Sequence, residues 1–166
     1  MRPLIRLWFF LALMAAAPAF AGPIENANAA VQRGDYAAAE QILLPIAEEG
    51  NPYAQYRLGL LYAEAPGELR SVAEAAKWFE WAALQGQPYA QYKLGMLYVK
   101  GDGVSRDYVV AYMWLSLSAR HAGGTAEAAR QRDMLATRMT TGQVDQAKRQ
   151  VRNWRPVRPE PLQPTR

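Results

Sequence analysis

The sequence predicts an all-α protein, a right-handed solenoid of stacked helix pairs with C-terminal capping helices. The segment 52–62 recurs at 88–98 with nine of its eleven residues unchanged. The same spacing of 36 residues relates Trp78 to Trp114. Within these segments apolar residues return every three or four positions, which is the period of an α-helix. One helix pair cannot bury both of its apolar sides, whereas stacked pairs share a continuous core.

The first 21 residues have the pattern of a secretory signal peptide. Arg2 and Arg6 accompany the start of an apolar run at 7–17, and an Ala-Phe-Ala triplet ends at Ala21. A basic start, a short apolar run and small residues before a cleavage point are the parts of such a signal. The run is shorter than the ~20 residues of a membrane span. We therefore expect residues 1–21 to be removed, with cleavage between Ala21 and Gly22, and a periplasmic or secreted product; an uncleaved N-terminal anchor is the alternative.

Each repeated unit carries residues that start and stop helices. Asn51 and Pro52 predict one helix start, because asparagine caps a helix and proline fits its first turn. Ser71 with Glu74 predicts a capping box at the start of the partner helix. Gly86 predicts the end of that partner helix.

Two kinds of residue inside the predicted helices disfavour helix formation. Gly59 recurs as Gly95, and a glycine at such a position costs about 1 kcal/mol relative to alanine. Its recurrence predicts the close approach of a neighbouring helix. Pro45 interrupts the stretch before the first complete unit, and an interior proline costs about 3 kcal/mol. We expect a kink or an early helix end there.

Shorter elements flank the repeats. Residues 22–34 are expected to form an opening helix, and 123–154 to form two capping helices. The first capping helix is expected to bury Ala129, Met134, Leu135 and Met139, and the second, with a capping box of Thr140 and Gln143, to bury Val144, Ala147, Val151 and Trp154. Residues 155–166 contain four prolines and three arginines, which predicts an extended or disordered tail.

A family pattern is visible in residues 35–122. The second unit carries A-x-x-L-G-x-L-Y, then G-x-G-V, then D-x-x-x-A-x-x-W, at Ala90, Leu94, Gly95, Leu97, Tyr98, Gly101, Gly103, Val104, Asp107, Ala111 and Trp114. The first unit has matching residues at Ala54, Leu58, Gly59, Leu61, Tyr62, Ala75 and Trp78, but its loop at 63–70 departs from the pattern. These residues resemble the Sel1-like repeat, a relative of the tetratricopeptide repeat. The resemblance implies the same solenoid fold.

The resemblance also implies an adaptor that presents a groove to a protein partner, here in the cell envelope. The candidate partner-binding residues lie on a second strip of the repeated helix, at Tyr53, Tyr56, Arg57, Tyr89, Tyr92 and Lys93. Tyrosine and arginine are enriched at binding hot spots, because they combine a large contact area with hydrogen bonding. The alternative is that these tyrosines pack between adjacent units and line no groove.

Composition limits the chemistry that the chain can perform. The 166 residues include no cysteine and one histidine, His121, so thiol nucleophiles, thiolate metal sites and multi-histidine metal sites are excluded. No serine is followed by lysine three residues later, as an S-x-x-K motif requires. We expect no cofactor and no metal, and a non-enzymatic protein. An enzyme, or a regulator of one, that acts on cell-wall or polysaccharide substrates remains the alternative.

Charge divides unevenly along the chain. Residues 22–119 carry 7 Lys and Arg against 11 Asp and Glu, whereas 120–166 carry 10 against 4. The basic C-terminal part is compatible with weak contact to an anionic lipid or an acidic polysaccharide, although a solvated helix face gives the same pattern. No nucleic-acid recognition motif is present, and we expect no nucleic-acid partner.

Overall fold

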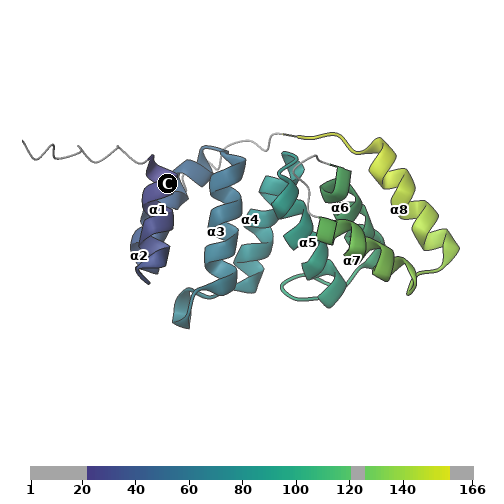
Figure 1. The fold of residues 1–166 in the computed structure, drawn as a ribbon, viewed down its shortest axis with the longest axis horizontal. Helices are drawn as coiled ribbons and strands as arrows, with labels where there is room; N and C mark the ends of the chain where they lie inside the picture. Colours follow the sequence, from purple (N-terminus) through teal and green to yellow (C-terminus); the bar gives the residue numbers. More distant parts are fainter. Residues whose placement is uncertain (1–21, 121–125, 158–166) are drawn as a thin grey trace, which may run out of the picture.

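A computed structural model describes residues 22–120 and 126–157 as a row of helices (Figure 1). The expected signal peptide with its cleavage point after Ala21, His121 and the end of the tail lie outside these ranges. In the described ranges the elements are α1 (Pro23–Gln32), α2 (Tyr36–Glu48), α3 (Pro52–Glu64), the 3-10 turn η1 (Gly67–Leu69), α4 (Val72–Leu84), α5 (Pro88–Lys100), α6 (Tyr108–Arg120), α7 (Ala126–Ala136) and α8 (Thr141–Asn153). The same ranges contain no strand, so the all-α prediction is confirmed.

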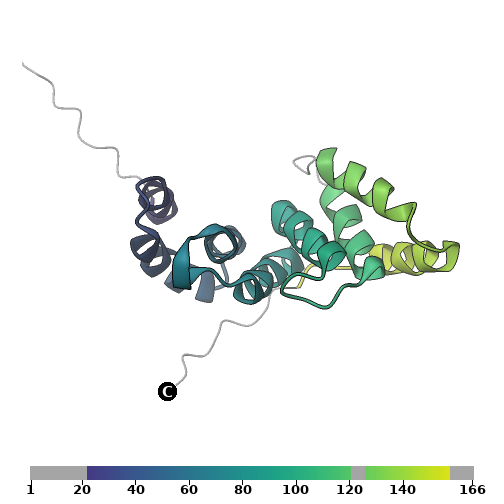
Figure 2. The same cartoon turned by 90° about the horizontal axis from the view of Figure 1, so that it is seen from below.

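Consecutive helices from α1 to α7 pack side by side along the array, and α8 packs back against α6. Seen from below, the array bends into a shallow arc whose ends, α1 and α7, stand on the same side of the middle helices (Figure 2). In this view α3 and α5 face the hollow side of the arc, and α4 lies behind them. The two copies of the repeated helix therefore line one surface.

The predicted helix starts are formed by side-chain caps. The Oδ1 of Asn51 accepts hydrogen bonds from the N–H groups of Tyr53 and Ala54, both at 3.0 Å, and Pro52 occupies the first turn. The capping box at the start of α8 is complete, because Thr140 N–H donates to Gln143 Oε1 at 2.9 Å and Gln143 N–H donates to Thr140 Oγ1 at 3.3 Å. Both predictions are confirmed.

The capping box expected at Ser71 is only half formed. Ser71 Oγ accepts the N–H of Glu74 at 3.3 Å, as predicted. The carboxylate of Glu74 instead binds Lys77 Nζ at 2.6 Å. The N–H of Ser71 donates to the carbonyl of Tyr62 at 2.8 Å. That donor is thus already satisfied by the preceding helix, and Glu74 is free to pair along its own helix.

The early helix end expected at Pro45 is wrong. Helix α2 continues to Glu48, and the N–H of Glu49 donates to the carbonyl of Pro45 at 3.0 Å. Pro45 has no N–H to donate, so the carbonyl of Gln41 loses its helical partner. Gln41 and Pro45 are both exposed, and this side of the helix is open to water.

The repeated glycines lie where two helices of a unit meet. A Cβ atom built on Gly59 would stand 2.6 Å from Cδ1 of Phe79, and one on Gly95 would stand 2.9 Å from Cγ of Leu115. The partner side chains belong to the next helix in each case, α4 and α6. The predicted close approach of a neighbouring helix is confirmed.

The buried stripe of α7 matches the prediction only in part: Leu135 is buried and Met139 is partly buried, as predicted. Ala128 and Leu135 are the buried residues of this helix, whereas Met134 is 58% exposed. They are seven residues apart and so share one side of the helix. Because Met134 neighbours Leu135 in sequence, it lies about 100° around the helix axis and leaves this side. The stripe of α8 is as predicted, with Ala147 and Val151 buried and Trp154 partly buried.

The first residues of the predicted tail are docked on the repeats. After α8 the chain runs back across the array, and the N–H of Val157 donates to the carbonyl of Leu84 at 2.8 Å. A Cβ on Gly86 would lie 3.6 Å from the Trp154 indole and 4.0 Å from Cβ of Pro156. Residues 155–157 are therefore extended, as predicted, but they are bound to the end of α4.

Candidate functional site

Three tyrosines from two successive units form a cluster, which we term the tyrosine cluster. The ring of Tyr56 lies 6.4 Å from that of Tyr53 and 5.9 Å from that of Tyr89. Tyr53 and Tyr89 follow the proline that starts α3 and α5, and Tyr56 follows one turn later. The identical helix starts thus place the rings at the junction between the two units.

The members of the tyrosine cluster differ in burial. Tyr53 is 45% exposed and Tyr89 is 44% exposed. Tyr56 is partly buried and packs 6.1 Å from the ring of Phe79 on α4. Burial raises the pKa of the Tyr56 hydroxyl. The central ring is therefore anchored in the core, and it supports two outer rings that present large apolar surfaces to solvent.

Tyr92 lies apart from this cluster. It packs against the core formed by α6, α7 and α8, as does Met96 one turn along α5. Burial, with a contribution from the nearby carboxylate of Glu127, raises the pKa of its hydroxyl. The repeated tyrosines thus divide into two exposed rings at Tyr53 and Tyr89 and two rings that pack between helices.

The two basic candidates have different surroundings. Lys93 Nζ makes an exposed ion pair of 3.2 Å with Glu64 Oε1, which links α5 to the end of α3. Arg57 borders a small cavity of about 100 Å³ between α1, α2 and α3, which we term the anchor pocket. The lining of this pocket is mostly apolar and comprises Val31, Tyr36, Leu43, Arg57, Leu60, Leu61, Glu64 and Ala65.

Sequence reasoning missed the anchor pocket because three helices build it. Val31 belongs to the opening helix, which lies outside the 36-residue pattern, and Tyr36 begins the half unit that follows this helix. Leu60 and Arg57 come from the repeated segment, and only Arg57 was among the candidate residues predicted from the sequence. No local spacing rule brings these stretches together, since their contact depends on how α1 and α2 pack against α3.

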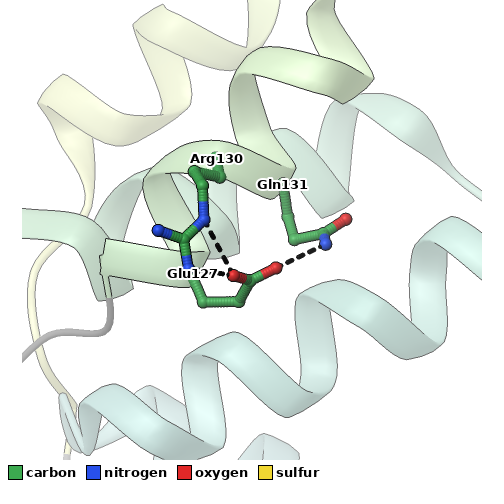
Figure 3. A network of polar contacts seen from close by, with 3 residues as sticks. All are labelled: Glu127, Arg130 and Gln131. Atoms are coloured by element: carbon green, nitrogen blue, oxygen red, sulfur yellow. Dashed lines mark hydrogen bonds and ion pairs between the residues drawn. The ribbon is translucent and has the colours of Figure 1, made fainter.

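A polar network lies on α7, near Tyr92. The carboxylate of Glu127 lies between Arg130 and Gln131, which both donate to it (Figure 3). The bond from Gln131 is 2.6 Å long and that from Arg130 Nε is 2.9 Å long. The bond to Gln131, followed by that to Arg130, lowers the pKa of Glu127. An ionised carboxylate is thus held beside Tyr92.

Two buried glutamines were also missed as structural residues. Gln55 Nε2 donates to the carbonyl of Ala47 at 3.0 Å, and Gln91 Nε2 donates to the carbonyl of Ala83 at 3.1 Å. Each bond joins a repeated helix to the end of the helix before it. The signal was present in the sequence, because glutamine is identical at these positions in both units.

The surface of α3 and α5 combines exposed aromatic rings with basic side chains and a small apolar pocket. Across 22–120 and 126–157 no three Asp, Glu or His side chains lie close enough together to hold a metal ion. Among the helices that the structure describes, none is long and apolar enough to cross a membrane. Exposed aromatic rings beside a lysine, an arginine and a small apolar pocket are the composition of an interaction hot spot.

Comparisons with known proteins agree with this geometry. A family model described as the Sel1 repeat matches residues 52–87 and 88–122. One similar solved structure is a protective antigen present in uropathogenic Escherichia coli strains, which displays an SLR fold; identity is 28%, the TM-score is 0.71, and the match covers 80% of this chain but 29% of that chain. Another is a Sel1 repeat protein from Oxalobacter formigenes, with 31% identity, a TM-score of 0.53, and coverage of 66% of this chain and 96% of that chain. No curated protein sequence matches.

Proposed function

Because the chain belongs to the Sel1 repeat family, we propose that it is a non-enzymatic adaptor that binds a protein partner in the cell envelope. Sel1 repeat proteins are generally protein-interaction modules, and their fold is typically a binding scaffold. The chain spans about 29% of the length of the antigen that it matches. The proposal therefore concerns the shared repeats and attributes no other function of the antigen to this chain.

One observation carries the proposal, namely the tyrosine cluster at the junction between the two repeated units. Tyr53 is 45% exposed and Tyr89 is 44% exposed. Both rings contact the ring of Tyr56, which packs against the core. A ring that is rigidly supported loses little conformational entropy when a partner covers it. The cluster therefore supplies preorganised contact area.

The anchor pocket extends this surface along α3. Arg57 and Leu60 line the pocket and follow Tyr53 and Tyr56 on the same helix, so a partner that crosses α3 meets both features. A cavity of about 100 Å³ is smaller than the ~300–1,000 Å³ of typical small-molecule sites. It suits one aliphatic side chain of a partner more than a separate small-molecule ligand.

Site-specific photo-crosslinking tests the binding face. A photoreactive phenylalanine derivative replaces Tyr53 in one variant and Tyr89 in another, and exposed Lys148 on α8 is the control position. In native envelopes both tyrosine positions should yield the same crosslinked protein, and position 148 should not. Crosslinks to this protein from position 148 alone would contradict the proposed face.

Export is the second part of the proposal and is supported by the signal pattern of residues 1–21. N-terminal sequencing of the chain recovered from a periplasmic or secreted fraction should begin at Gly22. Recovery of the chain with its first 21 residues attached, or only from the cytoplasm, would contradict export. Hydrolysis of cell-wall fragments by the purified protein would contradict the non-enzymatic role.

A further inference from the structure

The exposed side of α8 carries a basic patch, which comprises Lys148, Arg149, Arg152 and, just after the helix, Arg155. All four residues are exposed. The buried stripe of the same helix, Ala147 and Val151, faces the rest of the array. Since successive residues advance by about 100° around a helix, the three basic residues of α8 fall within one arc of about 100° outside this stripe.

The charges of the basic patch are not neutralised by carboxylates. In the ranges 22–120 and 126–157, none of its four side chains forms an ion pair. Nη1 of Arg155 donates to two neutral groups, the carbonyls of Arg152 at 3.0 Å and of Trp154 at 2.7 Å. Asp145, the acidic residue of α8, is exposed and is likewise unpaired in these ranges. Four positive charges and one negative charge thus leave a net charge of +3 on this segment.

The other capping helix, α7, has no such surplus of charge. Its Arg130 pairs with Glu127, and its Arg132 pairs with Asp133 at 2.7 Å. These are all the charged residues of α7. Of the two capping helices, α8 therefore carries the free positive charge.

The position of α8 favours an extended surface as the partner of the basic patch. Helix α8 stands at one end of the row of helices (Figure 1). The patch extends over about 10 Å of a convex helix face. Such a face can touch a flat anionic surface through several side chains at once, whereas a small anion is bound in a concave site.

An anionic phospholipid membrane provides a flat surface of this charge. Clusters of about four to eight Lys and Arg residues on a helix are typical of segments that adsorb to anionic headgroups. Residues 22–119 carry 7 basic and 11 acidic residues, so the same surface repels the body of the array and attracts its α8 end. We propose that the basic patch docks the protein on a membrane that contains anionic phospholipids. The tyrosine cluster on α3 and α5 shares no residue with the patch, so the two surfaces can be tested separately.

Vesicle co-sedimentation tests the proposal, with the chain that begins at Gly22 and so contains every residue that the structure describes. Vesicles of phosphatidylglycerol and phosphatidylcholine in equal parts should bind the protein at low salt. Vesicles of phosphatidylcholine alone should not bind it. Sodium chloride at about 1 M should release the protein, because it shortens the Debye length to about 3 Å.

Variants that remove charge test whether the basic patch makes the contact. Arg149→Gln combined with Arg152→Gln should weaken binding to the anionic vesicles about 25-fold, since each basic residue near such a surface contributes about fivefold. Arg33→Gln combined with Arg70→Gln is the matched control, because both residues are exposed and the same charge is lost from the part of the array between α1 and α4. This control should change binding by less than about twofold, since charges beyond a Debye length from the membrane are screened.

Asp145→Asn separates binding from folding. It removes the negative charge of α8 and should strengthen binding about fivefold, at an unchanged unfolding temperature. Polygalacturonate, a soluble polyanion, should leave the protein on the vesicles at the same concentration of charge. The proposal is overturned if anionic vesicles bind no more protein than neutral ones, if the Arg149 and Arg152 variant binds as the parent does, if Asp145→Asn binds no more tightly, or if polygalacturonate displaces the protein.

Discussion

Trp154 stands edge-on against Trp114, with ring centroids 6.3 Å apart and planes inclined at 76°. In the preceding unit Trp81 meets Trp78 in the same way, at 4.9 Å and 78°. The residue 36 positions after Trp81 is Leu117, so the second unit has no second indole of its own to pair with Trp114. The residue that follows α8 supplies one and ties the end of the chain to the repeats.

We therefore predict that Trp154→Ala destabilises the whole array. Truncation of a buried tryptophan costs about 3–5 kcal/mol, and for this partly buried ring we expect about 2–3 kcal/mol. Urea denaturation followed by circular dichroism measures the loss. Val157→Ala is the matched control, because Val157 lies in the same segment but is 58% exposed. Equal effects of the two substitutions would show that the indole contact does not stabilise the fold.

Replacement of the repeated glycines by alanine has two opposing effects on the free energy of unfolding. Gly59→Ala gains about 1 kcal/mol of helix propensity, but its Cβ would stand 2.6 Å from the Phe79 ring. Overpacking of this kind costs about 1–3 kcal/mol, so the packing term wins and the midpoint of urea unfolding should fall. Gly95→Ala should behave alike, since its Cβ meets both Leu115 and the carbonyl of Ala111.

Gly142→Ala provides the control for this pair. The glycine lies in the first turn of α8, and its Cβ would meet no atom within 4 Å. Only the propensity gain remains, and the free energy of unfolding should stay level or rise by up to about 1 kcal/mol. A loss of stability at Gly142 as large as that at Gly59 would contradict the packing explanation.

Much of the fold could be predicted because its determinants are local or periodic. Asn51 and Thr140 cap helices through atoms two or three residues away, and the 36-residue repeat makes Gly59 and Gly95 visible as one structural position. Pro45 misled the prediction of an early helix end, because Gln41, whose carbonyl loses its helical partner, lies on an exposed side of α2. The sequence alone does not state which side that is.

The candidate site was only partly predictable, because some contacts join residues that are far apart in the sequence and are not equivalent in the repeat. The tyrosine cluster joins equivalent residues, Tyr53 and Tyr89, so the repeat itself indicated it. The contact of Arg138 with Tyr108 joins non-equivalent residues 30 positions apart, and Trp154 reaches Trp114 across a larger separation. Such contacts depend on how the capping helices turn back, for which no spacing rule exists.

The buried glutamines lead to a prediction that depends on pH. Gln91 is fully buried, and its Nε2 donates to the carbonyl of Ala83. In Gln91→Glu an ionised carboxylate would face that carbonyl oxygen without water, so burial should raise the pKa of the new side chain. A raised pKa in the folded state means that stability is retained at low pH and is lost as the pH rises.

Urea unfolding at two values of pH measures this effect. The stability gap between the parent chain and Gln91→Glu should be wide at pH 7 and narrow at pH 4.5. Gln91→Leu, which cannot ionise, should lose about 1 kcal/mol from the missing hydrogen bond, with no such dependence. If the gap for Gln91→Glu is the same at both pH values, the introduced carboxylate is not buried as the structure requires.

The hydroxyl of Tyr62 leads to a prediction at alkaline pH. It donates to Glu40 Oε1 across α2 and α3, and burial, followed by this bond, raises the pKa of Tyr62 above its ordinary value. The ordinary tyrosine value, which also applies to the unfolded chain, is about 10. Because the folded value is higher, this group's contribution to stability is fully present below about pH 10 and is lost as the pH rises through the folded pKa.

Tyr62→Phe removes both the hydrogen bond and the ionisation. At pH 8 the variant should be less stable than the parent by about 1 kcal/mol, the usual net value of one hydrogen bond. At pH 11 the gap should shrink, because the parent loses stability there through Tyr62 and the variant does not. Burial also raises the pKa values of Tyr56, Tyr92 and Tyr98, but these groups are present in both chains and cancel in the difference. A stability gap that stays constant from pH 8 to pH 11 would mean that the pKa of Tyr62 is not raised in the folded state.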